Sequence, residues 1–259
     1  MDGTIRQLFH YPVKGLSAQP LQSVPLQTGQ GFPHDRVFGF ARHDSGFDPA
    51  TPQPMPKQRF FVLAQVARLA GLQSRFDPDT LQLQIRRDGH TVYADSLATT
   101  GGRDKAVAFL ADFLDLKPDQ QPVFAQGRDN RFTDVSIVSR DMMNAVSLIN
   151  LDSVRDFSQR SGHVVDPRRF RANIYFDGWP AFSELEHMGK TFSIGTAHFR
   201  ICMETKRCPA TEVNPDTAER DLRVPRLLLD HYGHPNMGVY AEVLAPGEIQ
   251  PGDVMRLDA

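Results

Sequence analysis

Alternation of apolar and polar residues dominates the first hundred positions of the chain. Leu81, Leu83 and Ile85 alternate with polar residues, which is the period of a half-buried β-strand. Asp88-Gly89 then predicts a hairpin turn into the next strand. The strands expected in this part cover residues 5–9, 37–41, 81–86 and 91–94. Between 48 and 57 the chain carries four prolines, which cannot donate to a sheet, so we expect a surface loop there.

The rest of the chain mixes helices with further strands. Between 103 and 116, apolar residues recur at i, i+3, i+4 and i+7 before Pro118, which predicts a helix. Further helices are expected over 151–160, capped by Asn150 or Asp152, and over 224–231, each followed by a glycine. The remaining strands are expected over 170–176, 191–194, 198–203, 238–244 and 254–257. Short strands with few helices predict a β-rich α+β fold that contains a barrel.

Composition excludes several classes of protein. The 259 residues suffice for one large domain or two small ones, and a net charge of −2 argues against general nucleic-acid binding. The amino terminus lacks the apolar region of a secretory signal, and no stretch approaches 18 apolar residues. Two cysteines rule out a disulfide scaffold and a four-cysteine iron–sulfur cluster. We therefore expect a soluble cytoplasmic protein with a small-molecule substrate and with neither nucleic acid nor membrane as a partner.

One predicted strand carries a cluster of polar side chains on a single face. With a period of two, Arg169, Arg171 and Asn173 share one face, while the apolar residues between them share the other. Two guanidinium groups on an apolar-backed strand can grip an anion or phosphate, because arginine offers planar bidentate donors. The alternative is a solvated outer face that carries surface ion pairs.

Cys208 is the candidate reactive residue. It follows Lys206 and Arg207, and adjacent cations favour the thiolate, the form that binds metals or attacks electrophiles. The alternative is a small buried side chain, but the polar loop after Cys208 favours exposure. Cys202 lies within the apolar alternation of 198–203, so we interpret it as a packing residue. The two cysteines have no further ligand nearby that would build a zinc site.

Taken together, these segments resemble MOSC proteins, named for the carboxy-terminal domain of molybdenum-cofactor sulfurase. Tyr11-Pro-Val-Lys14, Asp35-Arg36 and the proline-rich loop that leads into Lys57-Gln-Arg59-Phe are similar to an amino-terminal MOSC-type β-barrel domain. The later motifs are similar to the MOSC domain itself: Ser147-Leu-Ile-Asn, 169–174, Arg207-Cys208-Pro-Ala-Thr211 and Gly247-Glu-Ile-Gln-Pro-Gly252-Asp253. The resemblance implies an amino-terminal β-barrel domain over 1–100 packed against a β-barrel MOSC domain over 101–259, with a weakly marked boundary.

The resemblance also implies molybdenum chemistry, as in the amidoxime-reducing members of the family. Cys208 matches the cysteine that ligates molybdenum, and a thiolate is the soft ligand such an ion prefers. The molybdenum cofactor, Mo-molybdopterin, would then reduce N-hydroxylated compounds such as amidoximes, with electrons from a separate donor protein of reductase or ferredoxin type. The residues implied in cofactor binding are Lys14, Arg36, Lys57, Arg169, Arg171, Asn173, Arg207 and Thr211.

Two other functions use the same residues. A sulfur carrier or transferase would hold a persulfide on Cys208, and it needs an exposed thiol but no pterin pocket. A non-catalytic carrier of the cofactor would use the same pocket as the oxidoreductase. The two-sided strand over 169–176 favours the molybdenum-dependent oxidoreductase.

Overall fold

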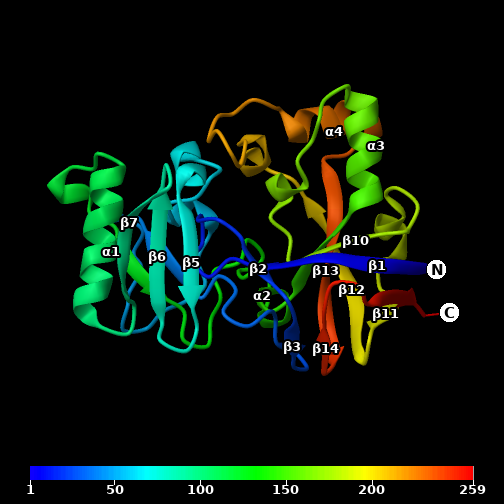
Figure 1. Cartoon of the computed structure of the whole chain (residues 1–259), viewed down its shortest axis with the longest axis horizontal. Helices are drawn as coiled ribbons and strands as arrows, with labels where there is room; N and C mark the ends of the chain where they lie inside the picture. Colours follow the sequence, from blue (N-terminus) through cyan, green and yellow to red (C-terminus); the bar gives the residue numbers. More distant parts are fainter. Residues whose placement is uncertain (259) are drawn as a thin grey trace.

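A closed β-barrel forms the larger lobe of the molecule. The computed structural model describes residues 1–258, and Figure 1 shows the barrel beside a smaller lobe. Seven strands follow one another in the ring order β10-β9-β13-β12-β11-β15-β1, and β1 pairs back to β10. All neighbours are antiparallel except the parallel pair β9 and β10. The barrel strands are β1 (Asp2–His10), β9 (Val146–Asn150), β10 (Ile174–Asp177), β11 (Thr191–Ile194), β12 (Ala197–Lys206), β13 (Asn236–Ala245) and β15 (Val254–Leu257).

Inward-facing apolar side chains fill the barrel, as expected for a ring of this size. Ile5, Phe176 and Phe199 are fully buried in one cluster, and Phe192 stacks on Phe199. Short strands extend the lobe at its rim: β2 (Gln19–Leu21) pairs with β1, and β3 (Val24–Leu26) pairs with β14 (Gly247–Ile249). The apolar core therefore stabilises the barrel, which holds the loops at its end in place.

The smaller lobe pairs β4 with β8 and carries a separate meander, β5-β6-β7, covered by α1 (Figure 1). Phe38, Phe76 and Leu110 meet in its core. Thr99 caps α1, because its side chain accepts a hydrogen bond from the Gly102 amide. The elements are β4 (Phe38–Ala41), β5 (Gln73–Asp77), β6 (Gln82–Arg87), β7 (His90–Ser96), α1 (Thr100–Phe113) and β8 (Val123–Gln126).

Helices α3 and α4 pack together on the outside of the barrel (Figure 1). The Asn150 side chain accepts from the Asp152 amide at the start of α3, and Gly162 ends it with a φ of 72°. Gly233 ends α4 in the same left-handed conformation, with a φ of 77°. The helices are α2 (Arg140–Met143), α3 (Leu151–Ser161) and α4 (Val224–Tyr232), and the 3-10 turns are η1 (Lys57–Arg59), η2 (Ala67–Gly71), η3 (Pro118–Gln120), η4 (Pro167–Phe170), η5 (Ser183–His187) and η6 (Pro209–Glu212).

The β-rich α+β class and the barrel are confirmed, and two local predictions are wrong. The strand expected over 170–176 begins only at Ile174, because η4 ends at Phe170 and Arg171 takes a left-handed φ of 53°. Arg169, Arg171 and Asn173 therefore do not share a strand face. Cys202 is exposed, because Phe199 and Ile201 fill the inward positions of β12.

Strand pairing crosses the expected boundary between residues 100 and 101. β1 closes the barrel together with strands that follow residue 145, and β8 pairs with β4 of the smaller lobe. The division into 1–100 and 101–259 stays a prediction. In describing the structure we use two lobes: a barrel lobe, which contains β1–β3 and the elements from α2 to β15, and a small lobe, which runs from β4 to β8.

Candidate functional site

A cavity of about 470 Å³ lies between the barrel lobe and the small lobe. Its size is that of a typical small-molecule site. We call it the main cavity. All nine residues that the sequence singled out for the site line it: Lys14, Arg36, Lys57, Arg169, Arg171, Asn173, Arg207, Cys208 and Thr211.

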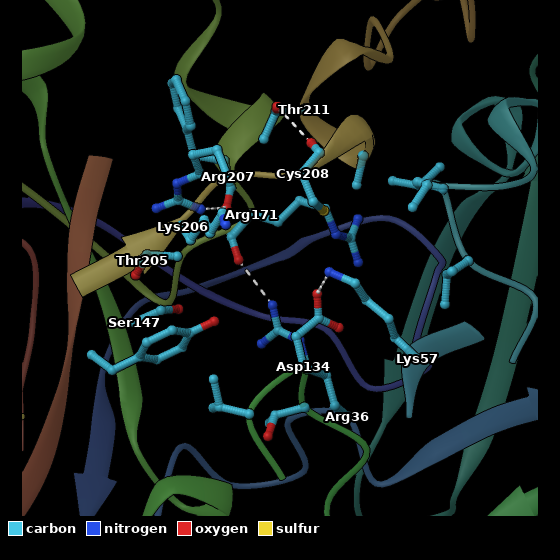
Figure 2. A pocket seen from close by; sticks show the side chains of 18 of the residues that line it. Arg36, Lys57, Asp134, Ser147, Arg171, Thr205, Lys206, Arg207, Cys208 and Thr211 are labelled. Carbon is cyan, nitrogen blue, oxygen red and sulfur yellow. Dashed lines mark hydrogen bonds and ion pairs between the residues drawn. The ribbon is translucent and has the colours of Figure 1, made fainter. Parts of the chain in front are cut away.

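Cys208 lies at the turn that follows β12, and its side chain is half-buried. The Thr211 amide and hydroxyl both bond to the Cys208 carbonyl, at 3.0 and 2.9 Å, which closes the turn. Figure 2 shows Cys208 and Lys57 facing the same space. Thr211 therefore holds the turn that presents the thiol.

The cation next to the Cys208 sulfur comes from the small lobe. Arg207 precedes Cys208, but its side chain is buried and donates to the carbonyl oxygens of Met237 and Phe170. Lys57 takes the place by the sulfur instead. Burial alone would lower the pKa of Lys57, but the nearby Asp134 carboxylate and Cys208 sulfur raise it above its usual value. The cation beside the Cys208 sulfur is therefore Lys57 and not Arg207.

Asp134 joins two of the cavity lysines. One of its carboxylate oxygens lies 2.7 Å from Lys14 Nζ, and the other lies 3.0 Å from Lys57 Nζ. Desolvation would raise the pKa of Asp134, but the two ammonium groups hold it well below its usual range. Lys14 is only 5% exposed, and burial lowers its pKa against the opposing effect of Asp134. The carboxylate thus stabilises the charge of a buried lysine.

Arg36 and Arg171 both stack on Tyr11. Their guanidinium carbons lie 4.5 and 4.4 Å from the ring centroid, within the range of cation–π contacts. Tyr11 is fixed because its hydroxyl donates to the Ala172 carbonyl at 3.2 Å. Arg36 is held further by Asp35, at 2.5 Å, and by the Arg171 carbonyl, at 2.9 Å.

Arg171 differs from Arg36 in having free donors. Burial and the neighbouring Arg36 charge lower the pKa of Arg171, opposed by the Tyr11 hydroxyl. Within residues 1–258 its guanidinium makes no hydrogen bond or ion pair, although it lines the main cavity. Its donors are therefore available to a ligand, because the side chain is held by stacking alone.

Three other predicted residues hold the walls of the cavity. Arg169 bonds to Asp221 at 2.6 Å and to the Glu212 carbonyl at 3.0 Å, which ties down the loop after η6. The Asn173 Oδ1 accepts from the Ser147 amide and hydroxyl, and its Nδ2 donates to the Phe9 carbonyl. Arg207 bonds to Met237 and Phe170, as described above. Their direct contact with a ligand stays a prediction.

Sequence reasoning missed several lining residues. Ser147 falls within a segment that carried the family resemblance, so a signal for it existed. Asp134 and Tyr240 lie outside every motif, and nothing in the sequence pointed to them.

The donor set of the main cavity suits an anion with a soft metal centre. Seven lining residues are cationic, and only Asp134 and Glu204 are acidic. Within the described part of the chain, no three His, Cys, Asp or Glu side chains cluster to hold a metal. Cys208 thus contributes the one thiol of a cavity whose many cationic side chains suit an anion such as phosphate. In residues 1–258, no helix is long and apolar enough to cross a membrane.

Comparison with known proteins identifies relatives of the chain. Residues 128–256 match the family described as MOSC domain. The chain is 22% identical to mitochondrial amidoxime reducing component 2 from Bos taurus over 282 residues, which cover 97% of this chain and 82% of that protein. It is similar to the crystal structure of the YuaD protein from Bacillus subtilis, with a TM-score of 0.46 and 12% identity over 99% of this chain and 96% of that one. It is also similar to YiiM from Geobacillus stearothermophilus, with a TM-score of 0.36 and 19% identity over 44% and 54% of the two chains.

Proposed function

We propose that this chain, which is a MOSC-domain protein, binds a molybdenum cofactor in its main cavity and reduces N-hydroxylated compounds. The MOSC domain and the distant similarity to an amidoxime reducing component support a protein of the molybdenum-cofactor-related class. The observation that carries the proposal is a cavity with one thiol and an excess of cations.

The side chains in the main cavity fit the two chemical ends of such a cofactor. Cys208 would be the protein ligand of molybdenum, since a thiolate is a soft donor. Lys14, Arg36 and Arg171 would hold the anionic end, because ammonium and guanidinium groups favour phosphate oxygens. The half-buried Arg171 supports this assignment, because its guanidinium stacks on Tyr11 and keeps its donors available to phosphate oxygens. When bound, the cofactor would supply the two-electron chemistry that converts an N–OH group to N–H and water.

The residues of the chain would prepare the site for that chemistry. Lys57 places a positive charge beside the Cys208 sulfur, and Asp134 fixes the position of that ammonium group. Tyr11 sets the spacing of Arg36 and Arg171, because both stack on its ring. Each turnover would consume two electrons and two protons, and a separate electron-donor protein would supply the electrons.

Metal and pterin analysis of freshly purified protein tests the proposal. We expect molybdenum and oxidised, fluorescent pterin in equal amounts after expression in a host that makes the cofactor. The same preparation should reduce benzamidoxime to benzamidine with a chemical reductant. A protein without molybdenum from that host would overturn the proposal, and cyanide-labile sulfur on Cys208 would then favour the sulfur carrier. Bound cofactor without reduction of any N-hydroxylated compound would favour the cofactor carrier.

A further inference from the structure

A second cavity of about 370 Å³ adjoins the main cavity. One wall consists of 70–74 of the small lobe together with 15–18, whose Leu16 packs in the core of that lobe. The barrel lobe supplies the other wall through 168–171 and 213–216. The two cavities share five lining residues, so they adjoin along a common wall. The shared residues are Gly15, Leu63, Arg169, Arg171 and Ala210.

The second cavity has many apolar lining residues, and the hydroxyl groups of its walls are already paired. Phe9, Leu16 and Val213 are among its apolar lining residues. Ser17 and Ser74 bond to each other across the wall, with their hydroxyl oxygens 3.1 Å apart. Polar groups that are satisfied within the protein place few demands on a ligand, so this wall suits an apolar body.

The charged groups of the second cavity are also paired, with one exception. Arg168 bonds to Asp216 at 2.6 Å, and Arg169 bonds to Asp221 at 2.6 Å. Arg171, on the shared wall, keeps its donors free and stacks with Arg36 on Tyr11. An occupant of the second cavity therefore meets uncompensated positive charge only where that cavity joins the main one.

We propose that the second cavity binds the apolar body of a neutral N-hydroxylated substrate, whose N–OH end enters the main cavity past Arg171 and Ala210. The inference rests on the proposed function, since it names where the substrate of that reaction lies. Ala210 is two residues from Cys208, so the shared wall leads toward the thiol. An amidoxime has an N–OH oxygen that accepts a hydrogen bond from a guanidinium group, and it carries no charge that would oppose Arg171.

The same charge distribution favours release of the product. Reduction of an amidoxime consumes two electrons and two protons, breaks the N–O bond and yields an amidine and water. The electrons come from the separate donor protein of the proposed function. An amidine is cationic at neutral pH, and Arg36 and Arg171 would repel it at short range. The second cavity should therefore prefer the amidoxime over the amidine.

Filling the second cavity tests the inference without the cofactor. Ala70 and Ala18 line the second cavity and do not line the main one. Binding of benzamidoxime and of benzamidine to the full chain, purified from a host that cannot make the cofactor, is measured by calorimetry. We expect benzamidoxime to bind more tightly than benzamidine, and A70L and A18L each to weaken benzamidoxime binding by roughly tenfold. A181L, on an exposed loop of the barrel lobe, is the matched control and should bind as the parent does.

Unchanged benzamidoxime binding in both filled variants, or tighter binding of benzamidine, would overturn the inference. The protein from a cofactor-competent host adds a second measurement. A70L should keep its molybdenum content, raise KM for benzamidoxime by roughly tenfold and leave KM for hydroxylamine, which has no apolar body, unchanged. Loss of molybdenum in both filled variants would mean that the cofactor itself extends into the second cavity, and would overturn the inference while leaving the proposed function intact. A parent protein without molybdenum would instead contradict the proposed function, and the binding data would still decide the inference.

Discussion

Cys208 and Cys202 lie six residues apart in the sequence and have opposite surroundings. Cys208 is half-buried at a turn that faces the main cavity, with Lys57 as the neighbouring cation. Cys202 lies on the outward face of β12, and its sulfur contacts the Tyr240 carbonyl at 3.2 Å. The chain thus contains a reactive candidate and a built-in control of the same residue type.

Replacing each cysteine in turn should show whether Cys208 ligates the metal, with Cys202 as the control. C208A should abolish benzamidoxime reduction, and C208S should be nearly as inactive, because a hydroxyl poorly replaces a soft thiolate. C202A should keep its turnover and change the free energy of unfolding by less than about 0.5 kcal/mol, since the side chain is exposed. Activity is measured with a chemical reductant and normalised to bound molybdenum. Full activity in C208A, or its loss only in C202A, would contradict the role of Cys208 as the ligand.

Loss of the Asp134 side chain should lower the stability of the ligand-free protein. D134A leaves the buried Lys14 ammonium without its partner, so we expect a loss of about 1–3 kcal/mol in the free energy of unfolding. Urea unfolding measures this, with D129A, an exposed residue of the same segment, as the control. Added inorganic phosphate should restore part of the lost stability, because an anion can replace the carboxylate between the lysines. A D134A variant as stable as the parent would contradict this assignment.

The pH dependence of stability gives a separate test of Asp134. Its folded pKa is lowered, so its contribution is present above the unfolded value of a carboxyl group, near 4. The contribution is lost as the pH falls from there toward the lower folded pKa. The difference in stability between the parent and D134A should therefore be constant near neutral pH and should shrink in acid. A difference that grows below pH 4 would have the wrong sign for this pair.

At the scale of elements, the segment 166–177 shows where sequence reasoning succeeds and fails. The alternation of Phe170, Ala172, Ile174 and Phe176 is compatible with a strand, but only its last part forms one. Asp166 accepts a bond from the Arg168 amide, and the Arg171 amide bonds to the Arg168 carbonyl, so the chain turns first. A local cap and turn outweigh the periodicity here, and Arg171 reaches the main cavity because of that turn.

Local sequence signals elsewhere predicted turns and helix ends correctly. They could not predict contacts between residues that are far apart in the sequence. The Asp88-Gly89 turn, the Asn150 cap and the glycines after α3 and α4 each depend on a few neighbouring residues. Asp134 meets Lys14 across 120 positions of the sequence, so its role follows only from the folded chain. The family resemblance implied the set of cavity residues, but it did not indicate which arginine side chains have hydrogen-bond donors without a partner.

Arg171 has a left-handed backbone conformation, so two substitutions there can distinguish the effect of its side chain from the effect of its backbone. R171A and R171G both remove the guanidinium group, so each should weaken cofactor binding by about 1.5–3 kcal/mol. Glycine adopts the φ of 53° freely, whereas alanine bears a strain of roughly 1 kcal/mol. We therefore expect R171G to be the more stable of the two but equally poor in cofactor occupancy. Molybdenum content and thermal unfolding measure these effects, and normal occupancy in R171G would show that the guanidinium group is not a ligand.

At the scale of the whole molecule, the site exists only where the two lobes meet. The chain leaves the barrel lobe after β3, builds the small lobe and returns through 127–145 to close the barrel. Lys57 belongs to the small lobe, whereas Cys208 and Arg171 belong to the barrel lobe. The relative position of the lobes therefore sets the distance between the thiol and its neighbouring cation.

Arg220 is a side chain that directly joins the two lobes. From the barrel lobe, it donates to the carbonyls of Leu63 and Ala64 in the small lobe, each at 2.8 Å, and to the Pro209 carbonyl at 2.6 Å. One guanidinium group thus joins the residue after Cys208 to the opposite wall of the main cavity. Only a planar fork of donors can reach these three acceptors at once.

Removal of this link should loosen the site without unfolding either lobe. In R220A, amide hydrogen exchange should speed up at 61–64 and at 208–212, while the barrel strands keep their protection. Cofactor occupancy should fall, because Lys57 and Cys208 would no longer be held at a fixed spacing. R220K should recover only part of the protection, since an ammonium group cannot supply the fork. R200A removes a surface arginine that pairs with Glu242 on the outside of the barrel, and it should leave both segments unchanged. If exchange at 61–64 and 208–212 is the same in R220A as in the parent, the lobes are held by their apolar contacts, and Arg220 has no positioning role.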